Sequence, residues 1–276
     1  MKKTWLITGC SSGLGQHLAR AVAARGDQVV ATARNPEKLQ DLARTHPDSV
    51  RICALDVTRP EEAQAAVALA VQAFGGLDVL VNNAGYGLYG AIEEGVAEEY
   101  RPMFDVNVFG LIEVTRAALP ALRQRPGGRI VNMSSAAGLV GGAGSGYYAA
   151  TKFAVEGLSE SLDQEVRPFG LRVILAEPGP FRTGFLGRSI ALAKRRMSEY
   201  DQTAGQRRAY RESNDGRQAG DPAKAVDVIL RAVDSDAPPL HLPLGPVAYQ
   251  VADKKLGALR KDMEAWRAVA IATDFD

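Results

Sequence analysis

The stretch "TGCSSGLG", residues 8–15, separates a short apolar run over residues 3–8 from a helical pattern over residues 14–25. Glycines at a strand-to-helix turn let the backbone approach a ligand, and the free N–H groups and positive dipole end of the helix attract a pyrophosphate. The spacing is Gly-x-x-x-Gly-x-Gly instead of the usual Gly-x-Gly-x-x-Gly, and a plain tight turn would use glycines as well. Because the turn directly follows the first predicted strand, we favour a phosphate-binding turn made by Gly9, Ser11, Ser12, Gly13, Leu14 and Gly15.

Beyond this turn, short β-branched runs alternate with longer helical patterns along the chain. Strands are predicted over residues 3–8, 28–33, 50–55, 77–81, 128–133, 171–176 and 240–242. Helices are predicted over residues 14–25, 36–45, 60–74, 98–123, 147–167 and 222–234. Such alternation is typical of an α/β fold. We therefore predict a Rossmann-type, doubly wound parallel sheet of about seven strands with helices on both faces, in one domain over residues 1–276.

Two segments depart from this alternation. Residues 181–217 form a long polar segment with nine basic and four acidic residues. Long segments in a compact α/β domain are usually lids or binding loops, so we predict a substrate lid, although a solvated helical face would account for the charge. Residues 246–271 resemble an added amphipathic helix, which we expect to serve packing or oligomer formation.

The composition is that of an ordinary soluble protein, with 46% hydrophobic and 24% charged residues and a net charge of +1. No block of like charge suggests a nucleic-acid partner, and no run of 18 apolar residues suggests a membrane span. The two cysteines and three histidines are scattered, which predicts no metal site and a reducing, cytoplasmic setting. The apolar N-terminal run ends too soon for a signal peptide.

The end of the second predicted strand, "VVATARN" at residues 29–35, bears on the choice of dinucleotide. NAD-binding proteins generally place an acid there to hold the ribose 2′-hydroxyl. Here Ala33 stands where an acid is expected, and Arg34 follows it. Because a guanidinium pairs with a 2′-phosphate, the sequence favours NADP(H), with NAD(H) as a weaker ligand; a solvated arginine at a strand end is the alternative.

The stretch "YYAATK", residues 147–152, places two tyrosines just before a lysine in a predicted helix. Residues four apart share a helix face, so Tyr148 and Lys152 are neighbours while Tyr147 points about 100° away. An ammonium beside a phenol favours the phenolate and would lower its pKa toward neutral pH. The alternative is an ordinary surface pair.

Taken together, these motifs resemble the single-domain branch of the short-chain dehydrogenase/reductase family from residue 4 to about residue 185. The resemblance rests on "TGCSSGLG" at 8–15, "LDV" at 55–57, "NNAG" at 82–85, "NVFG" at 107–110, "IVNMSS" at 130–135, "YAATK" at 148–152 and "EPGPFRT" at 177–183. Each motif alone is weak, but all seven occur in the family's order. The stretches "ATARNPEKL" and "EPGPFRT" are also similar to 17β-hydroxysteroid and retinol dehydrogenases.

The resemblance implies roles for individual residues. The family places a serine thirteen residues before its tyrosine, which selects Ser135 over Ser134. The implied catalytic residues are Asn107, Ser135, Tyr148 and Lys152. Asn107 would bend its helix and hold a water near Lys152. The implied coenzyme-binding residues, beyond the glycine turn and Arg34, are Asp56 and Val57 at the adenine, Asn83, Ala84 and Gly85 near the adenosine ribose, Tyr148, Lys152, and Pro178, Gly179 and Thr183 around the nicotinamide.

The implied reaction is hydride transfer between nicotinamide and a carbonyl or secondary alcohol, with Tyr148 as acid or base and Ser135 donating to the same oxygen. Residues expected to flank the substrate are mostly apolar, which suggests a bulky hydrophobic small molecule: Leu139, Val140, Gly141, Gly142, Tyr147, Phe181, Phe185 and Leu186. An acidic keto-ester or acyl substrate, held by lid arginines, is an alternative. A catalytically silent dinucleotide-sensing protein is another. Family members commonly pair through the helices near 98–123 and 147–167, so a homodimer or homotetramer is expected.

Overall fold

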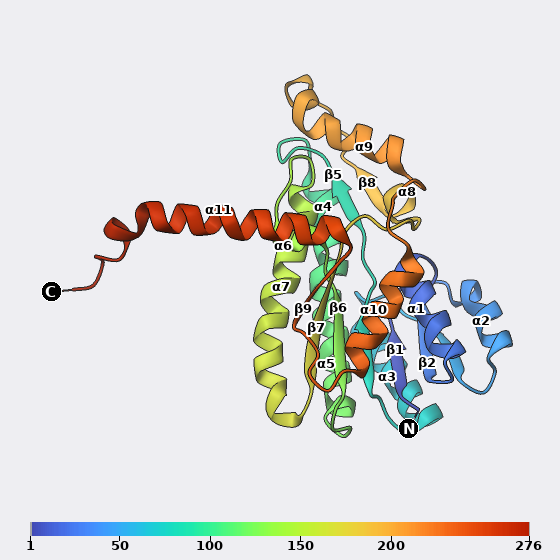
Figure 1. Ribbon diagram of the computed structural model, residues 1–276. Helices are drawn as coiled ribbons and strands as arrows, with labels where there is room; N and C mark the ends of the chain where they lie inside the picture. Colours follow the sequence, from blue (N-terminus) through green and yellow to red (C-terminus); the bar gives the residue numbers. More distant parts are fainter. Residues whose placement is uncertain (1, 276) are drawn as a thin grey trace.

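A computed structural model describes residues 2–275 and contains a seven-stranded parallel sheet in the order β3-β2-β1-β4-β6-β7-β9 (Figure 1). The strands are β1 (Thr4–Ile7), β2 (Gln28–Ala33), β3 (Val50–Ala54), β4 (Val79–Asn82), β6 (Arg129–Met133), β7 (Arg172–Pro178) and β9 (His241–Leu244). The chain starts at the centre with β1, winds outward to β3, and then returns to β4 on the other side of β1. The predicted doubly wound α/β fold is therefore confirmed.

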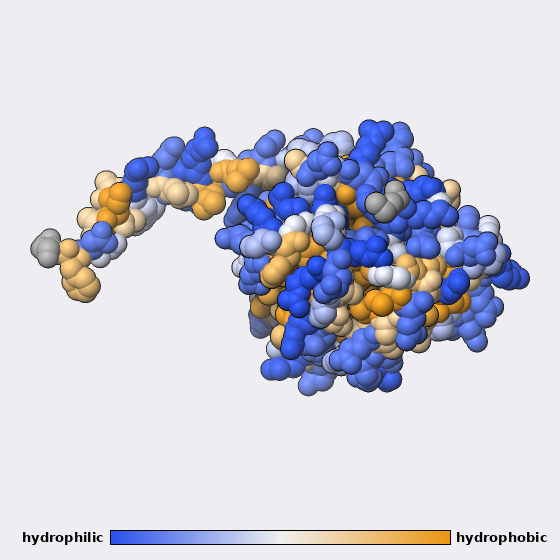
Figure 2. Space-filling model, turned by 90° about the horizontal axis from the view of Figure 1, so that it is seen from below, coloured by the Kyte–Doolittle hydropathy of each residue, from blue (hydrophilic) through white to orange (hydrophobic). Residues whose placement is uncertain are grey.

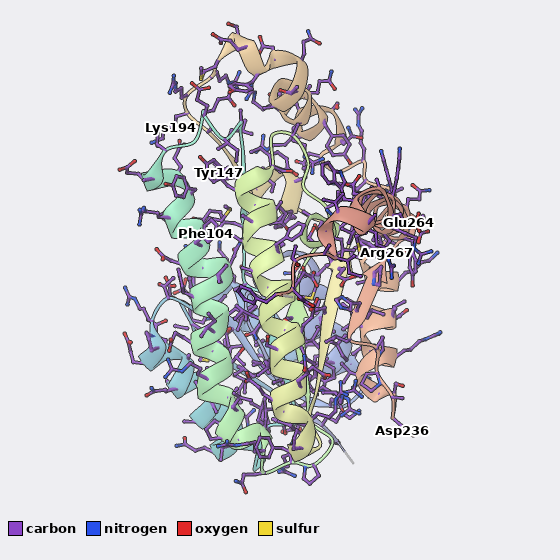
Figure 3. The ribbon with its side chains drawn as sticks, turned by 90° about the vertical axis from the view of Figure 1, so that its left-hand side faces the viewer. Phe104, Tyr147, Lys194, Asp236, Glu264 and Arg267 are labelled. Carbon is purple, nitrogen blue, oxygen red and sulfur yellow. The ribbon has the colours of Figure 1, made fainter. Side chains whose placement is uncertain are left out.

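Helices cover both faces of the sheet because side chains of successive strand residues point to opposite sides. Trp5 and Ile7 pack on one face with residues of α1 (Gly13–Ala24) and α10 (Pro222–Asp234). Leu6 packs on the other face with residues of α3 (Pro60–Phe74) and α5 (Leu111–Leu122). The long helix α7 (Gly146–Val166) lies beside α5 over β7 (Figure 3). All three of these β1 side chains are fully buried, which makes β1 the centre of the core.

The predicted helix over residues 98–123 is wrong as one continuous α-helix. The structure has α4 (Ala97–Phe104), a π-helical segment η2 (Asp105–Gly110), and then α5. The wide turn of η2 brings the Asn107 side chain against the backbone of Tyr86. Gly110 packs closely on Val57, where an added Cβ would lie 2.5 Å from the valine side chain. These long-range contacts explain why local spacing did not reveal the break.

The sequence also did not predict several short elements. Strands β5 (Gly87–Tyr89) and β8 (Ile190–Leu192) form a separate parallel pair. Further elements that were not predicted are α6 (Ala136–Leu139), α8 (Phe185–Arg188), η4 (Ser198–Tyr200), η5 (Asp201–Gly205) and α9 (Gln206–Asn214). The helix predicted over residues 36–45 is present as η1 (Pro36–Leu39) followed by α2 (Gln40–Thr45), and η3 (Arg167–Phe169) follows directly after α7. Together with β5, the elements from α8 to α9 lie above the carboxyl ends of the main strands in Figure 1.

Helix α11 (Pro246–Ala270) projects from the body of the protein (Figure 1), and only Ala248 in it is buried. Figure 2 shows hydrophobic and hydrophilic side chains interspersed along this projection. Its exposed hydrophobic residues include Leu256, Leu259, Met263 and Trp266, all of which are about half or more exposed. Within residues 2–275 no helix has both the length and the apolar character needed to cross a membrane.

Candidate active site

A cleft of about 1410 Å³ opens at the carboxyl ends of the strands, between the main sheet and residues 181–217. Four predicted site residues do not line it, namely Gly15, Asn107, Leu139 and Tyr147. The predicted residues that do line it are Gly9, Ser11, Ser12, Gly13, Leu14, Arg34, Asp56, Val57, Asn83, Ala84, Gly85, Ser135, Val140, Gly141, Gly142, Tyr148, Lys152, Pro178, Gly179, Phe181, Thr183, Phe185 and Leu186. The sequence motifs thus converge on one cavity from seven separate parts of the chain.

The glycine-rich turn forms the floor of one end of the cleft. Gly9 and Gly13 have φ values of 71° and 62°, a backbone conformation that favours glycine. A Cβ on Gly15 would lie 2.2 Å from Nδ2 of Asn83, so α1 approaches the loop after β4 too closely for any side chain there. Ser12 begins α1 without a side-chain cap, which leaves backbone N–H groups of the first turn open toward the cleft. This cradle fits a dinucleotide pyrophosphate.

Asn83 holds the turn in place. Its Nδ2 donates to the carbonyl oxygens of Thr8 and Gly9 at 2.8 and 3.1 Å, and the Thr8 hydroxyl accepts from the N–H groups of Asn83 and Ala84 at 2.9 Å each. The side-chain N–H groups of Asn83 are therefore committed to the turn. A support role for the "NNAG" stretch follows from these bonds.

Arg34 and Lys38 line the cleft together with Asp56, at the end where the adenosine was predicted to bind. The Oδ1 of Asp56 accepts from the N–H and the hydroxyl of Thr58 at 3.0 and 2.7 Å, so this carboxylate also caps its own turn. Burial opposes ionisation, but the Thr58 hydrogen bonds and the charge of Arg34 together lower the pKa of Asp56. The sequence analysis missed Lys38, although its spacing of four from Arg34 across the start of η1 could have signalled a second cation.

Tyr148, Lys152 and Ser135 meet at the other end of the cleft. Tyr148 and Lys152 lie on one face of α7, with Nζ 5.8 Å from the centre of the phenol ring. Ser135 is the N-cap of α6, its Oγ accepts from the N–H of Ala137 at 3.1 Å, and it is near enough to Tyr148 to act on the pKa of the phenol. Gly87 of β5 packs on the ring, because a Cβ there would lie 3.2 Å from Cδ2 of Tyr148. The ring of Phe185 lies 5.9 Å from that of Tyr148.

The pKa of Tyr148 differs from our expectation that the neighbouring ammonium would lower it. Burial raises the pKa of Tyr148, and the side chain of Ser135 and the charge of Arg207 only partly offset this effect. Burial also lowers the pKa of Lys152 to about 8, against the opposing charge of Glu156. The Nζ of Lys152 donates to the carbonyl of Met133 at 2.7 Å. The protein alone therefore holds Tyr148 protonated at neutral pH, in the form that can donate a proton.

Tyr147 points away from the cleft, in contrast to its predicted place in the substrate pocket. Its hydroxyl donates to the carbonyl of Ile92 at 2.6 Å, and its ring stacks on Tyr100 of α4 with the ring centres 4.7 Å apart. Figure 3 labels Tyr147 at the start of α7, on the side of α4. Leu139 likewise lies outside the lining of the cleft. Because the two tyrosines are adjacent on α7, their side chains point in different directions and lie in different environments.

Asn107 lies behind the cleft wall and is almost fully buried. Its Nδ2 donates to the carbonyl of Tyr86 at 2.8 Å and to the hydroxyl of Thr151 at 3.1 Å, while its Oδ1 accepts from the N–H of Tyr86 at 3.0 Å. A Cβ on Gly85 would lie 3.0 Å from Oδ1 of Asn107 and 3.8 Å from Nζ of Lys152, so both side chains converge on this glycine. Asn107 therefore fixes the position of the segment that faces Lys152.

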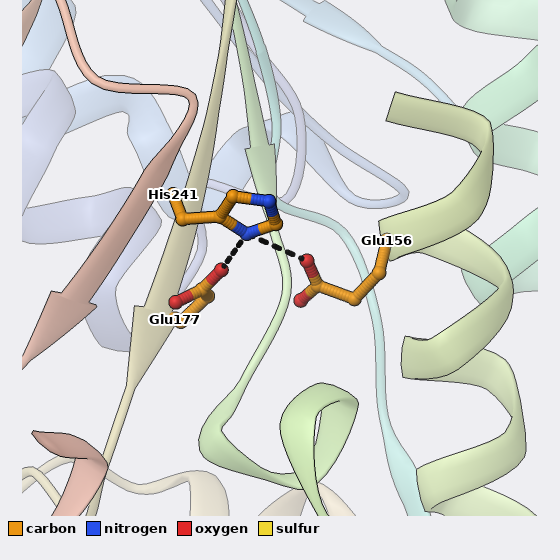
Figure 4. Close-up of side chains that lie close together, drawn as sticks. All are labelled: Glu156, Glu177 and His241. Atoms are coloured by element: carbon orange, nitrogen blue, oxygen red, sulfur yellow. Dashed lines mark hydrogen bonds and ion pairs between the residues drawn. The ribbon is translucent and has the colours of Figure 1, made fainter. Parts of the chain in front are cut away.

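A polar cluster of Glu156, Glu177 and His241, which sequence reasoning missed, is shown in Figure 4. It lies near Lys152, because the charge of Glu156 acts on the ammonium. Nδ1 of His241 lies 2.8 Å from Glu177 and 3.6 Å from Glu156, and Glu156 also accepts from the Ser134 hydroxyl. Burial raises the pKa of both carboxyl groups. The donor atoms of Glu156, Glu177 and His241 lie within 4.8 Å of one another, so these residues could also hold a metal ion, which the sequence analysis did not predict. The one sequence feature that could have indicated this cluster is Glu156, which lies four residues after Lys152 on the same helix.

Residues 181–217 close the substrate side of the cleft with Phe181, Phe185, Leu186, Arg207 and Tyr210. A buried ion pair anchors this segment, because Nη1 of Arg208 lies 2.6 Å from Oε2 of Glu94. The backbone N–H groups of Ala91 and Met197 also donate to Glu94, at 2.7 and 3.0 Å. The lid prediction itself stays a prediction, since it concerns motion.

Comparison with known proteins agrees with this arrangement. A family model described as short chain dehydrogenase matches residues 3–191. This protein belongs to the short-chain dehydrogenase family. The oxidoreductase BOA17 of Botryotinia fuckeliana is 37% identical over 99% of the chain and 100% of its own length. A short-chain dehydrogenase from Streptomyces avermitilis is 42% identical, covers 100% of both chains and has a TM-score of 0.92.

A structure of lower sequence identity to this chain contains a dinucleotide. It is an alcohol dehydrogenase from Thermococcus sibiricus complexed with 5-hydroxy-NADP, which is 26% identical with a TM-score of 0.73 and covers 88% of this chain and 96% of its own. The predicted family is therefore confirmed, and the chain is an oxidoreductase of that family. The resemblance to 17β-hydroxysteroid and retinol dehydrogenases stays a prediction.

Proposed function

We propose that this short-chain dehydrogenase is an NADP(H)-dependent oxidoreductase that interconverts a carbonyl compound and a secondary alcohol. The observation that carries the proposal is the grouping of Tyr148, Ser135 and Lys152 at one end of a cleft whose other end is a glycine-lined phosphate cradle. Within this cleft the apolar side chains of Phe185 and Leu186 face the tyrosine end, which supports a bulky hydrophobic substrate.

The nicotinamide coenzyme, when bound, supplies or accepts the hydride. In the reducing direction Tyr148 donates its hydroxyl proton to the substrate oxygen, and Ser135 donates a hydrogen bond to the same oxygen as negative charge develops on it. The ammonium of Lys152 stabilises the phenolate that Tyr148 leaves behind. Because the pKa of Lys152 is lowered to about 8, this support is present at neutral pH and is lost as pH rises above that value.

Coenzyme choice rests on Arg34 and Lys38. Both cations line the adenosine end of the cleft, and the strand before them ends in Ala33 instead of an acid. A guanidinium and an ammonium at this place favour a 2′-phosphate over a free hydroxyl. The complex of the Thermococcus sibiricus relative with an NADP derivative is consistent with NADP(H) as a ligand of this fold. The weaker binding proposed for NAD(H) rests on Arg34 and Lys38 alone.

Assembly into a homodimer or homotetramer and a cytoplasmic location complete the proposal. Phe109 of η2 and Phe153 and Leu158 of α7 are all more than a third exposed, and they support pairing through these helices. Cys10 and Cys53 are free thiols, which suits a reducing compartment.

The proposal is tested by following NADPH absorbance with a panel of bulky ketones and aldehydes. We expect Tyr148→Phe to lose at least about a hundredfold in kcat while it still binds NADPH, because only the proton donor is removed. Tyr147→Phe is the matched control, since Tyr147 faces Tyr100 and Ile92, and it should keep most of the activity. Normal turnover by Tyr148→Phe would overturn the proposal.

A further inference from the structure

Arg207 is the feature of the substrate side that the proposed reaction leaves without a role. It lies on α9, lines the cleft, and places its guanidinium carbon 4.9 Å from the ring centre of Tyr89 and 5.7 Å from that of Tyr210. The charge of Arg207 also opposes the effect of burial, which raises the pKa of Tyr89. The aromatic rings fix the plane and position of the guanidinium without neutralising its charge.

No carboxylate among the residues that the structure describes forms an ion pair with Arg207, and its Nε is buried without a hydrogen-bond partner. The next residue shows the contrast, since Arg208 is nearly fully buried and pairs with Glu94 at 2.6 Å and with Asp201 at 3.6 Å. A half-buried guanidinium is costly unless an anion compensates it. Arg208 is therefore neutralised within the fold, whereas the charge of Arg207, the preceding residue on α9, is not neutralised by a carboxylate and faces the cleft.

The surroundings of Arg207 favour an anion from the substrate. Arg207 lies over Tyr89 of β5, and Gly87 of the same strand packs on the ring of Tyr148, so Arg207 lies near the reacting end. The acidic residues that line the cleft are Asp56, Asp105 and Glu113, which follow β3 or lie on η2 and α5. Asp56 and Asp105 are on the side of Arg34, because the charge of Arg34 acts on Asp56 and on Tyr86, a neighbour of Asp105. Glu113 forms an ion pair with Arg116 at 3.2 Å, and none of the three lining acids forms one with Arg207.

We propose that Arg207 binds a carboxylate of the substrate, and that the substrate class is an oxo acid, or the matching hydroxy acid, with a bulky apolar body. The planar guanidinium fork matches a carboxylate with two parallel hydrogen bonds, while the apolar body packs against Phe185 and Leu186. This inference rests on the proposed oxidoreductase function and narrows its substrate.

The test compares acids with their methyl esters. The probes are 2-oxo-4-phenylbutanoate, 4-oxo-4-phenylbutanoate and 5-oxo-5-phenylpentanoate, which vary the separation of carbonyl and carboxylate, each beside its neutral ester. We expect the wild type to prefer at least one acid over its ester about tenfold in kcat/KM. Arg207→Gln should lose about 30-fold on that acid, the effect of one charged hydrogen-bonded pair, and change less than about threefold on the ester. Arg207→Lys should fall between the two, because it keeps the charge and loses the fork.

Controls separate this inference from a structural role and from failure of the proposed function. Arg195→Gln removes an exposed arginine of the same segment and should change neither substrate. The KM for NADPH should not change in Arg207→Gln; an increase would assign Arg207 to the coenzyme and overturn the inference. Preference for the ester at every length, or equal losses on acid and ester, would also overturn it. Turnover of esters alone would leave the proposed function intact.

A binding measurement keeps the inference testable if none of these probes is reduced. With NADPH present, 4-phenylbutyrate should raise the Tm of the wild type, and 4-phenylbutanamide, its neutral analogue, should raise it less. The difference should disappear in Arg207→Gln, whose own Tm without ligand serves as the check on folding. Equal shifts by the acid and the amide in the wild type would contradict a carboxylate site.

Discussion

Replacing Lys152 with methionine should make the protein more stable at neutral pH while it abolishes efficient turnover. Burial lowers the pKa of Lys152 from the usual 10.5 to about 8, and each pKa unit corresponds to about 1.4 kcal/mol. Holding the ammonium charged in the fold therefore costs about 3 kcal/mol. Loss of the hydrogen bond to the Met133 carbonyl takes back about 1 kcal/mol. The net expectation for Lys152→Met is a gain of about 2 kcal/mol at pH 7.

The gain has a defined pH dependence. Below pH 8 both the folded and the unfolded wild type carry the charge, so the full cost is present. Between pH 8 and 10.5 the folded protein loses the proton first, and the wild type therefore gains stability relative to the variant as pH rises. Above this window the ionisation cost is absent, and the lost hydrogen bond leaves the variant slightly less stable.

Denaturation in urea at pH 7 and at pH 10 measures both quantities, with Lys194→Met as the control at an exposed lysine. The control should change the free energy of unfolding by no more than about 0.5 kcal/mol. A Lys152→Met protein that is less stable than the wild type at pH 7 would refute the reasoning. So would a stability difference between the two proteins that is the same at both pH values.

Three further outcomes follow from the geometry. Gly15→Ala should abolish NADPH binding and destabilise the fold by about 2 to 4 kcal/mol, because the added Cβ would displace the Asn83 amide and break its two hydrogen bonds. The control is Gly157→Ala on α7, where an added Cβ meets nothing within 4 Å. In the same thermal and NADPH-titration assays the control should be neutral or slightly stabilising. Arg34→Leu should raise the KM for NADPH at least about tenfold and leave that for NADH nearly unchanged, and equal effects would remove the coenzyme assignment. Glu94→Gln should leave the buried Arg208 without its nearer charge partner, with Asp201 remaining at 3.6 Å, and should speed proteolysis within residues 181–217. Because burial is outweighed by hydrogen bonds that lower the pKa of Glu94, the stability advantage of the wild type should persist above about pH 4 and fade as pH drops further.

Hydrophobic runs and helical spacing in the sequence predicted the features that depend on neighbouring residues in the chain. Buried parallel strands have continuous apolar runs, so β1, β2 and β6 could be placed from the sequence to within a residue or two. Helical spacing alone was sufficient to put Tyr148 beside Lys152 and to turn Tyr147 elsewhere. Helical spacing did not reveal the wide turn at η2, because the partner that Asn107 holds lies 21 residues earlier in the chain; only the family resemblance implied that Asn107 bends its helix.

The charges of the site were the least predictable feature. The sequence showed the ammonium beside the phenol but gave no measure of burial, which reverses the expected direction for the pKa of Tyr148. The cluster near Lys152 brings Glu156 of α7, Glu177 of β7 and His241 of β9 together, and no local spacing relates these elements. Only the order of strands in the sheet places β9 beside β7 and so delivers the histidine to the two carboxylates.

The projecting helix α11 gives this protein two separate intrinsic fluorescence signals. Of its two tryptophans, Trp5 is fully buried and donates from Nε1 to Asp27 at 3.0 Å, whereas Trp266 is 68% exposed on α11. Emission from Trp5 should shift to the red only when the sheet unfolds. Emission from Trp266 should shift to the blue when a binding partner buries this part of α11. A Trp266→Phe protein isolates the first signal, so unfolding and association can be followed by one optical measurement in the same cuvette.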